Sequence, residues 1–149
     1  MDIEELLARE EIRQLIAIYA TAGDGGRREQ FGTVFTLDAV LRAPGIHYEG
    51  RDNIVQGLFA DNQSDSTKRP AVKFVRHNIT TSNITFTGPD GAKGRSYFVV
   101  VTDAGLDHSG VYTDEFRKID GAWKIASRDV RIDYCSPETR FELGAGRAG

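Results

Sequence analysis

The chain has 149 residues, of which 40% are hydrophobic and 28% charged, so it suits one domain with a buried core and is not disordered. Its net charge of −3, from 19 basic and 22 acidic residues, argues against a protein that binds nucleic acid through phosphate contacts. No apolar stretch is long enough to cross a bilayer and no secretory signal is visible, so we expect a cytoplasmic protein. Cys135 is the only cysteine, which excludes an internal disulfide and a cysteine-based zinc site.

The first half of the sequence predicts helices. Residues 3–22 carry apolar side chains at the spacing of one buried helix face, and Asp2 stands at the capping position before them. Residues 27–37 and 52–61 predict two shorter helices, with a hairpin over 39–49 between them.

From residue 72 onward the sequence predicts strands. Four segments rich in β-branched and aromatic residues are separated by turn sequences, which is typical of an antiparallel meander. These segments are residues 72–87, 94–103, 109–118 and 122–133. Helices followed by a meander predict an α+β fold, a cone-shaped barrel in which a strongly curved antiparallel sheet wraps around the N-terminal helices. Residues 62–70 are expected to form a loop and residues 136–149 a loose tail.

Two polar side chains stand where the strand pattern calls for apolar ones. In the first strand, His77 shares a face with Val75 and Ile79, which predicts that it points inward. In the last strand, alternation from Trp123 places Arg131 inward too, where its charge needs a carboxylate or a polar ligand. An ordinary hydrogen-bonded core histidine would also explain His77, and an internal ion pair would also explain Arg131, so the residues alone leave a functional role open.

Asp24 is a candidate partner for His77. It follows the first helix in a glycine-rich stretch, residues 23–26, five positions after Tyr19 on the buried face. A carboxylate beside an imidazole would fix its tautomer and make it a general base. Asp24 also suits an ordinary turn, and spacing alone does not bring it to His77.

Four segments, in this order, resemble the SnoaL-like branch of the nuclear transport factor 2-like superfamily over nearly the whole chain. They are residues 19–24, Arg76-His77-Asn78, residues 110–125 and Val130-Arg131-Ile132. The resemblance implies a single domain over residues 1–149. It also implies a cofactor-independent lyase with an Asp–His dyad, as in bile acid 7α-dehydratases, lindane dehydrochlorinases and scytalone dehydratases.

Carried over to this sequence, the resemblance assigns the dyad to Asp24 and His77, leaving-group assistance to Tyr19, and a pocket arginine to Arg131. Substrate-lining positions are expected at Val75, Val99, Tyr112 and Trp123. Scytalone dehydratases carry a second catalytic histidine on the strand that matches residues 94–103. This sequence has none there, so scytalone itself is not the expected substrate.

The expected function is therefore proton abstraction from carbon by His77 in a small hydrophobic, cyclic or aromatic molecule. Dehydratase-type elimination is favoured, while isomerisation and C–C cleavage stay open because they use the same base. No metal, cofactor, nucleic acid or membrane is expected to take part. The alternative is a non-catalytic ligand-binding or assembly module of the same fold, such as the small subunit of a ring-hydroxylating oxygenase.

We also expect a homo-oligomer, with a trimer ahead of a dimer. The lyases that the chain resembles are trimers, and strand alternation places four apolar side chains on the outer face of the sheet. These are Phe98, Val100, Val130 and Ile132. The remaining histidines, His47 and His108, are expected at the surface without a functional role.

Overall fold

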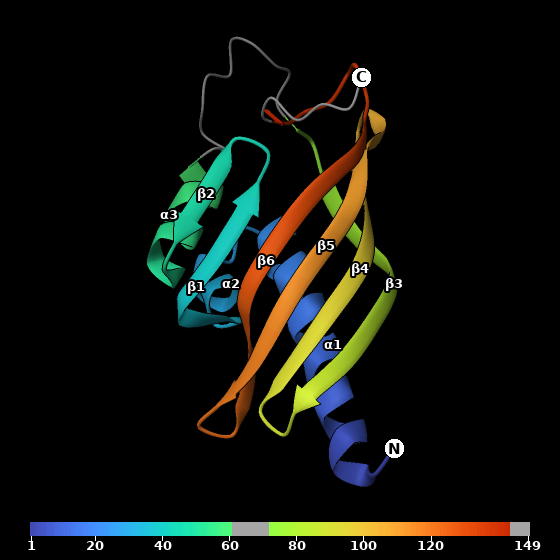
Figure 1. The fold of residues 1–149 in the computed structure, drawn as a ribbon. Helices are drawn as coiled ribbons and strands as arrows, with labels where there is room; N and C mark the ends of the chain where they lie inside the picture. The colour runs from blue at the N-terminus through green and yellow to red at the C-terminus, as the bar shows by residue number, and fades with distance from the viewer. Residues whose placement is uncertain (61–71, 144–149) are drawn as a thin grey trace.

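The computed structural model describes residues 1–60 and 72–143. The elements, in chain order, are α1 (Ile3–Asp24), α2 (Arg28–Gly32), β1 (Phe35–Ala43), β2 (Ile46–Glu49), α3 (Arg51–Ala60), β3 (Val75–Gly88), β4 (Gly91–Thr102), β5 (Gly105–Ile119) and β6 (Ala122–Cys135). One six-stranded sheet has the order β2-β1-β6-β5-β4-β3, with α1 lying across its concave side (Figure 1). The predicted α+β fold, with a curved meander around N-terminal helices, is confirmed. Within the described ranges, no helix has both the length and the hydropathy needed to span a membrane.

Helix α1 forms where its apolar spacing predicts. Asp2 caps its start, because Oδ1 accepts a hydrogen bond from the Glu5 N–H at 2.8 Å. The buried face includes Ile12, Leu15, Ile16 and Tyr19, as predicted. The helix packs against β3 and β6 and runs on to Asp24, two residues beyond the predicted end. Asp24 therefore belongs to the last turn of the helix rather than to the loop after it.

Residues 27–37 do not form one helix. Helix α2 ends at Gly32, and Phe35 already pairs in parallel with Ile125 of β6. The N–H of Ile125 donates to the carbonyl of Val34 at 2.7 Å. Phe31 lies in α2 as expected, but Phe35 joins the sheet, because pairing with β6 outweighs the local helical pattern.

The faces of β4 differ from the prediction. Cross-strand pairing places Val100 opposite His77 and Phe98 opposite Ile79, and residues directly opposite each other share a face. Phe98 and Val100 are therefore buried on the inner face, at 2% and 0% exposure. The prediction that they lie on the outer face is wrong.

A bulge at Ala126 changes the faces of β6. Ile125 pairs with Phe116 and Ser127 with Glu115, so Ala126 has no partner and the alternation shifts by one residue. The inward positions beyond the bulge are Arg128, Val130 and Ile132. The predicted outward placement of Val130 and Ile132 is wrong for this reason.

Strand β5 begins earlier than predicted. The turn before it needs only residues 103 and 104, because Gly105 adopts a φ of +93° that favours glycine. Val100 pairs with His108 and Val101 with Leu106, so Asp107 is a second bulge. Residues 105–108 are thus strand, and both Asp107 and His108 are buried.

Residues 136–143 are anchored to the start of β5. The Thr139 hydroxyl donates to Asp107 Oδ1 at 2.6 Å, and the Arg140 N–H donates to Asp107 Oδ2 at 2.8 Å. The expectation of a loose tail is therefore wrong for this segment. The loop expected over 62–70 and the end of the tail, residues 144–149, lie outside the described residues.

Candidate active site

Asp24 at the end of α1 contacts His77 on the inner face of β3. Asp24 Oδ1 lies 2.5 Å from His77 Nδ1, and Asp24 Oδ2 accepts the backbone N–H of His77 at 2.8 Å. The Asp24 side chain is 9% exposed and that of His77 24%. The predicted contact is confirmed, and the backbone bond holds the carboxylate in one orientation.

This arrangement determines the tautomer of His77. An ionised carboxylate only accepts hydrogen bonds, so Nδ1 carries the proton and neutral His77 keeps a lone pair on Nε2. Asp24 and the partial negative charge at the C-terminal end of α1 both stabilise the imidazolium that forms when Nε2 takes a proton. The pair therefore has the chemistry of a general base.

Arg128 of β6 lies fully buried on the same inner face. Its Nε and Nη2 each donate to a carboxylate oxygen of Asp114, both at 2.8 Å, and neither side chain is exposed. The guanidinium carbon lies 4.2 Å from the ring centroid of Tyr19 and 4.0 Å from that of Tyr112. Burial would lower the pKa of Arg128, but Asp114 outweighs it and raises that pKa above its ordinary value. Nη1 is the only fully buried nitrogen or oxygen without a partner among the described side chains.

Tyr19 and Tyr112 are neutral phenols at neutral pH. Burial raises the pKa of both side chains, and the charge of Arg128 only partly opposes this. The charge of Asp24 also contributes to the raised pKa of Tyr112, which places that tyrosine within electrostatic reach of the dyad. Tyr19 packs against Phe31 at 4.8 Å between ring centroids, and Tyr112 lies 5.9 Å away.

Arg131 does not reach the interior. Its side chain is 61% exposed and pairs with Asp133 at 2.7 Å, because the bulge at Ala126 turns it to the outer face. The prediction that Arg131 points inward is wrong, and Arg128 takes that place. Arg128 could not be found from the alternation of β6 alone. Its inward position and its pairing with Asp114 depend on the bulge, which appears only when β5 and β6 are paired.

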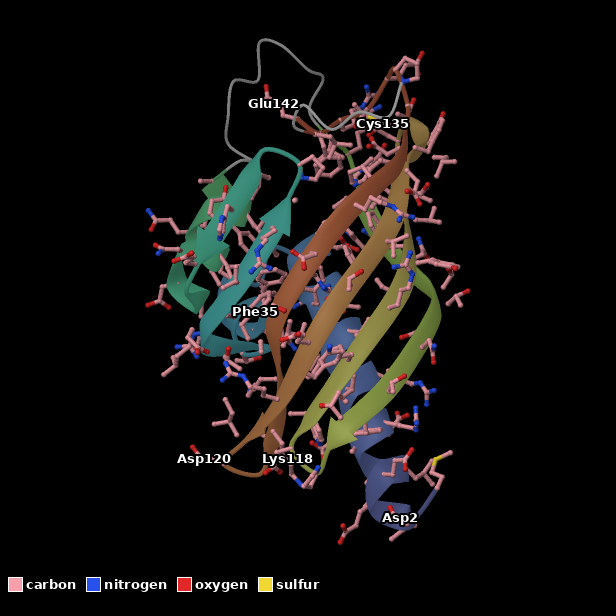
Figure 2. The ribbon with its side chains drawn as sticks, in the orientation of Figure 1. Asp2, Phe35, Lys118, Asp120, Cys135 and Glu142 are labelled. Atoms are coloured by element: carbon pink, nitrogen blue, oxygen red, sulfur yellow. The ribbon has the colours of Figure 1, made fainter. Side chains whose placement is uncertain are left out.

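Two of the four expected lining residues lie elsewhere. Val99 is on the outer face, between the buried Phe98 and Val100. Trp123 is buried against Phe86, with 5.7 Å between ring centroids, at the end of the sheet where Lys118 pairs with it. That end is opposite to Cys135, as Figure 2 shows. His108 pairs with Cys135, and His77 and His108 both pair with Val100, so both histidines lie toward the Cys135 end. Val75 and Tyr112 do lie on the inner face.

His108 is a functional candidate that sequence reasoning missed. It is buried, its Nδ1 lies 2.7 Å from Asp107 Oδ1, and its ring centroid is 6.4 Å from that of His77. Burial lowers its pKa, and the neighbouring Asp107 opposes that shift. The Asp-His dipeptide is the available signal, but the turn predicted between the strands 94–103 and 109–118 hides it, because it places His108 at the surface.

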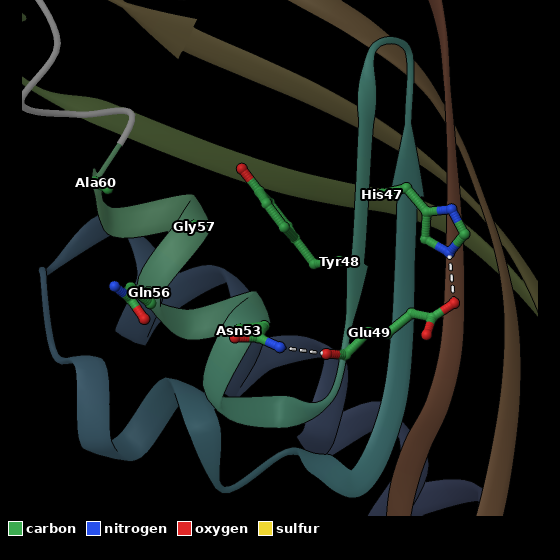
Figure 3. A pocket seen from close by; sticks show the side chains of 7 residues that line it. All are labelled: His47, Tyr48, Glu49, Asn53, Gln56, Gly57 and Ala60. Atoms are coloured by element: carbon green, nitrogen blue, oxygen red, sulfur yellow. Dashed lines mark hydrogen bonds and ion pairs between the residues drawn. The ribbon is translucent and has the colours of Figure 1, made fainter.

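A surface cleft at the opposite edge of the sheet is unrelated to this site. It is lined by His47, Tyr48, Glu49, Asn53, Gln56, Gly57 and Ala60, from β2 and α3 (Figure 3). His47 is exposed, as predicted, and lies 3.3 Å from Glu49. Strand β2 and the His77 strand β3 are the two edges of the sheet. Across residues 1–60 and 72–143, no three His, Cys, Asp or Glu side chains are grouped so that they could hold a metal ion.

Comparison with known proteins identifies the family. The model of the SnoaL-like domain matches residues 4–129. A search of curated proteins found no match. A variant of Rv3472, a protein of unknown function from Mycobacterium tuberculosis, is 30% identical, with 87% of this chain and 74% of that one covered and a TM-score of 0.74.

Two further crystal structures share the fold. One is a provisionally assigned scytalone dehydratase from Novosphingobium aromaticivorans, at 22% identity, full coverage of both chains and a TM-score of 0.76. The other is the beta subunit of a provisionally assigned aromatic-ring-hydroxylating dioxygenase from the same organism, at 20% identity, coverage of 89% and 93%, and a TM-score of 0.73. At these identities they show the fold alone. Because the family model spans most of the sequence, the chain belongs to the SnoaL-like domain family.

Proposed function

We propose that the protein is a cofactor-independent lyase or isomerase in which His77 removes a proton from carbon. The substrate class is a small hydrophobic, cyclic or aromatic molecule. The observation that supports this most is the pair of hydrogen bonds between Asp24 and His77, to Nδ1 at 2.5 Å and to the backbone N–H at 2.8 Å. One hydrogen bond would be enough to satisfy a buried histidine. Here the Asp24 carboxylate contacts both the ring and the backbone of His77, so it fixes the orientation of the ring and its tautomer.

In the proposed reaction, the lone pair of His77 Nε2 takes the proton and the C–H electrons move to the adjacent carbon. In an elimination they form a double bond as the leaving group departs with its electrons. In an isomerisation they move onto a carbonyl oxygen, which carries the negative charge until the proton on Nε2 returns to a different carbon and the carbonyl re-forms. Arg128 Nη1 and the neutral hydroxyls of Tyr19 and Tyr112 are the donors proposed to hold that oxygen or leaving group. Arg128 thus takes the role that the resemblance gave to Arg131.

A second candidate is a non-catalytic module of the same fold, since one structure with this fold belongs to a dioxygenase subunit. Such a module does not need a group that takes a proton from a carbon atom of its ligand. The two candidates therefore differ in whether a bound compound exchanges its C–H hydrogen with solvent.

Deuterium exchange tests the proposal even while the product is unidentified. The protein is incubated in D₂O with hydroxylated steroids, halogenated alicyclics and lignin-type aromatics, and mass spectrometry follows mass gain, elimination and isomer products. We expect His77→Gln to lower the rate by about 10²- to 10⁴-fold, the usual contribution of a general base. Asp24→Asn should also lower it, because an amide N–H facing Nδ1 favours the tautomer without a lone pair on Nε2.

Two matched controls separate the dyad from general damage. His47→Gln changes an exposed histidine of β2, and Arg131→Gln changes the exposed arginine of β6. Both should keep the wild-type rate and KM. Wild-type turnover by His77→Gln would contradict the mechanism, and a compound that binds without any exchange would favour the non-catalytic module.

A further inference from the structure

His108 is placed to act together with His77. Both histidines pair with Val100, one from β3 and one from β5, so they flank it on the inner face. Their ring centroids are 6.4 Å apart, a distance that one small functional group and its neighbouring carbon can bridge. Phe98 and Phe141 hold the His108 ring by edge contacts, at centroid distances of 6.0 and 5.2 Å.

Asp107 is held as an ionised carboxylate behind this ring. Oδ1 accepts from the Thr139 hydroxyl at 2.6 Å, and Oδ2 accepts from the Thr102 hydroxyl at 3.1 Å and the Arg140 N–H at 2.8 Å. Burial opposes ionisation, but the Thr139 hydroxyl, the Arg140 N–H and His108 together lower the pKa of Asp107. The carboxylate therefore only accepts hydrogen bonds, and the Nδ1–H of His108, 2.7 Å from Oδ1, donates one to it.

The other ring nitrogen of His108 remains free. No described residue forms a hydrogen bond to Nε2, yet Nε2 is not among the fully buried atoms that lack a partner. It is therefore accessible, although the side chain is only 7% exposed. Since neutral imidazole has a single N–H and Nδ1 holds it, Nε2 presents a lone pair.

We propose that His108 is a substrate-binding residue whose Nε2 accepts a hydrogen bond from a hydroxyl on the substrate, close to the carbon that His77 deprotonates. This inference rests on the proposed function, because it places the hydroxyl beside the carbon that His77 deprotonates. The hydroxyl is one that stays on the molecule, because an accepting nitrogen does not help an oxygen to leave. The substrate class is thus narrowed to phenols, enols or alcohols with an acidic C–H one or two bonds away.

The first test reads the tautomer of His108 in the wild-type full chain. Long-range ¹H–¹⁵N spectra of ¹⁵N-histidine protein distinguish protonated from bare ring nitrogens, and His108→Phe assigns the signals by their loss. We expect Nδ1 protonated and Nε2 bare, the opposite of the tautomer preferred by free histidine. A protonated Nε2 at neutral pH would overturn the proposal.

The second test measures hydroxyl recognition with 2-naphthol and 2-methylnaphthalene, which are similar in size but differ in the donor. The ratio of their dissociation constants in the wild type is compared with the ratio in His108→Phe, which keeps the ring packing but has no nitrogen. We expect the variant to lose about 3- to 10-fold of the preference for 2-naphthol, the usual contribution of one hydrogen bond. His47→Phe is the matched control and should lose none.

The outcomes separate this inference from the proposed function. His77→Gln should lower the rate of exchange at carbon by about 10²- to 10⁴-fold and keep the preference for 2-naphthol, whereas His108→Phe should lose that preference. An unchanged ratio in His108→Phe, or no binding of 2-naphthol to the wild type, would overturn the inference whatever the fate of the exchange reaction. If His108→Phe does not fold, the wild-type spectrum decides. The chain has three histidines, so His47→Phe and His77→Gln assign the other two and leave the signals of His108. Its Nε2 signal should move with 2-naphthol and not with 2-methylnaphthalene.

Discussion

Arg128 and Asp114 face each other across β6 and β5 as a fully buried ion pair, joined by two hydrogen bonds of 2.8 Å. Arg131 and Asp133 form a second such pair on β6, but it lies on the outer face and both side chains are about half exposed or more. The two pairs use the same chemistry in two environments. The exposed pair of β6 is therefore a control for the buried one, because the two differ mainly in burial.

Asp114→Ala should lower the free energy of unfolding by about 3–5 kcal/mol, because it leaves the Arg128 charge buried without a partner. Asp133→Ala should change it by less than about 1 kcal/mol, since water screens the exposed pair. Urea unfolding followed by circular dichroism measures both. Equal losses in the two variants would contradict the assigned burial.

Stability should depend on pH through His108. Burial lowers its pKa from the ordinary 6.5, so below pH 6.5 the unfolded chain binds a proton that the folded chain does not. The free energy of unfolding should therefore rise with pH up to about 6.5 and then level off. In His108→Phe this part of the slope should disappear. Urea unfolding at roughly pH 5 to 7.5 tests it, and an unchanged slope in the variant would assign the dependence to another group.

Thr139 should matter for stability although it lies beyond the last strand. Its hydroxyl donates to Asp107 in a buried setting, so Thr139→Val leaves the carboxylate with one donor fewer. We expect a loss of about 1–3 kcal/mol in the free energy of unfolding. Thr80→Val, at an exposed hydroxyl on β3, is the control and should be nearly neutral.

The expected homo-oligomer would have to form through other residues than the four predicted from the sequence, because those four lie on the inner face of the sheet. The outer face of the meander carries Tyr97, Leu106 and Tyr134, which are 46–49% exposed. We expect Tyr97→Asp with Leu106→Asp to lower the mass seen by light scattering, from a trimer of about three times 16.5 kDa toward a single chain. Leu37→Asp, at a 75% exposed position of β1, is the control and should leave the mass unchanged. A wild-type mass of one chain would contradict the expectation.

Local sequence patterns predicted an element well where its structure depends only on its own residues. The buried face of α1 followed from helical spacing, and the inward position of His77 followed from alternation with Val75. The family resemblance brought Asp24 to His77, and the structure agrees. Spacing alone could not do so, because α1 and β3 meet only through the packing of the whole sheet.

The sequence by itself determined which segments become helices and strands, apart from residues 33–37 and 105–108, since side-chain periodicity is a local property of the chain. Only the tertiary structure decided which face several polar residues take. Ala126 and Asp107 are bulges, and a bulge exists only as a mismatch between two paired strands, so no single strand shows it. Each bulge shifts the alternation by one residue. That shift moves Arg131 out and Arg128 in on β6, and on β5 it allows Asp107 and His108 to be buried side by side.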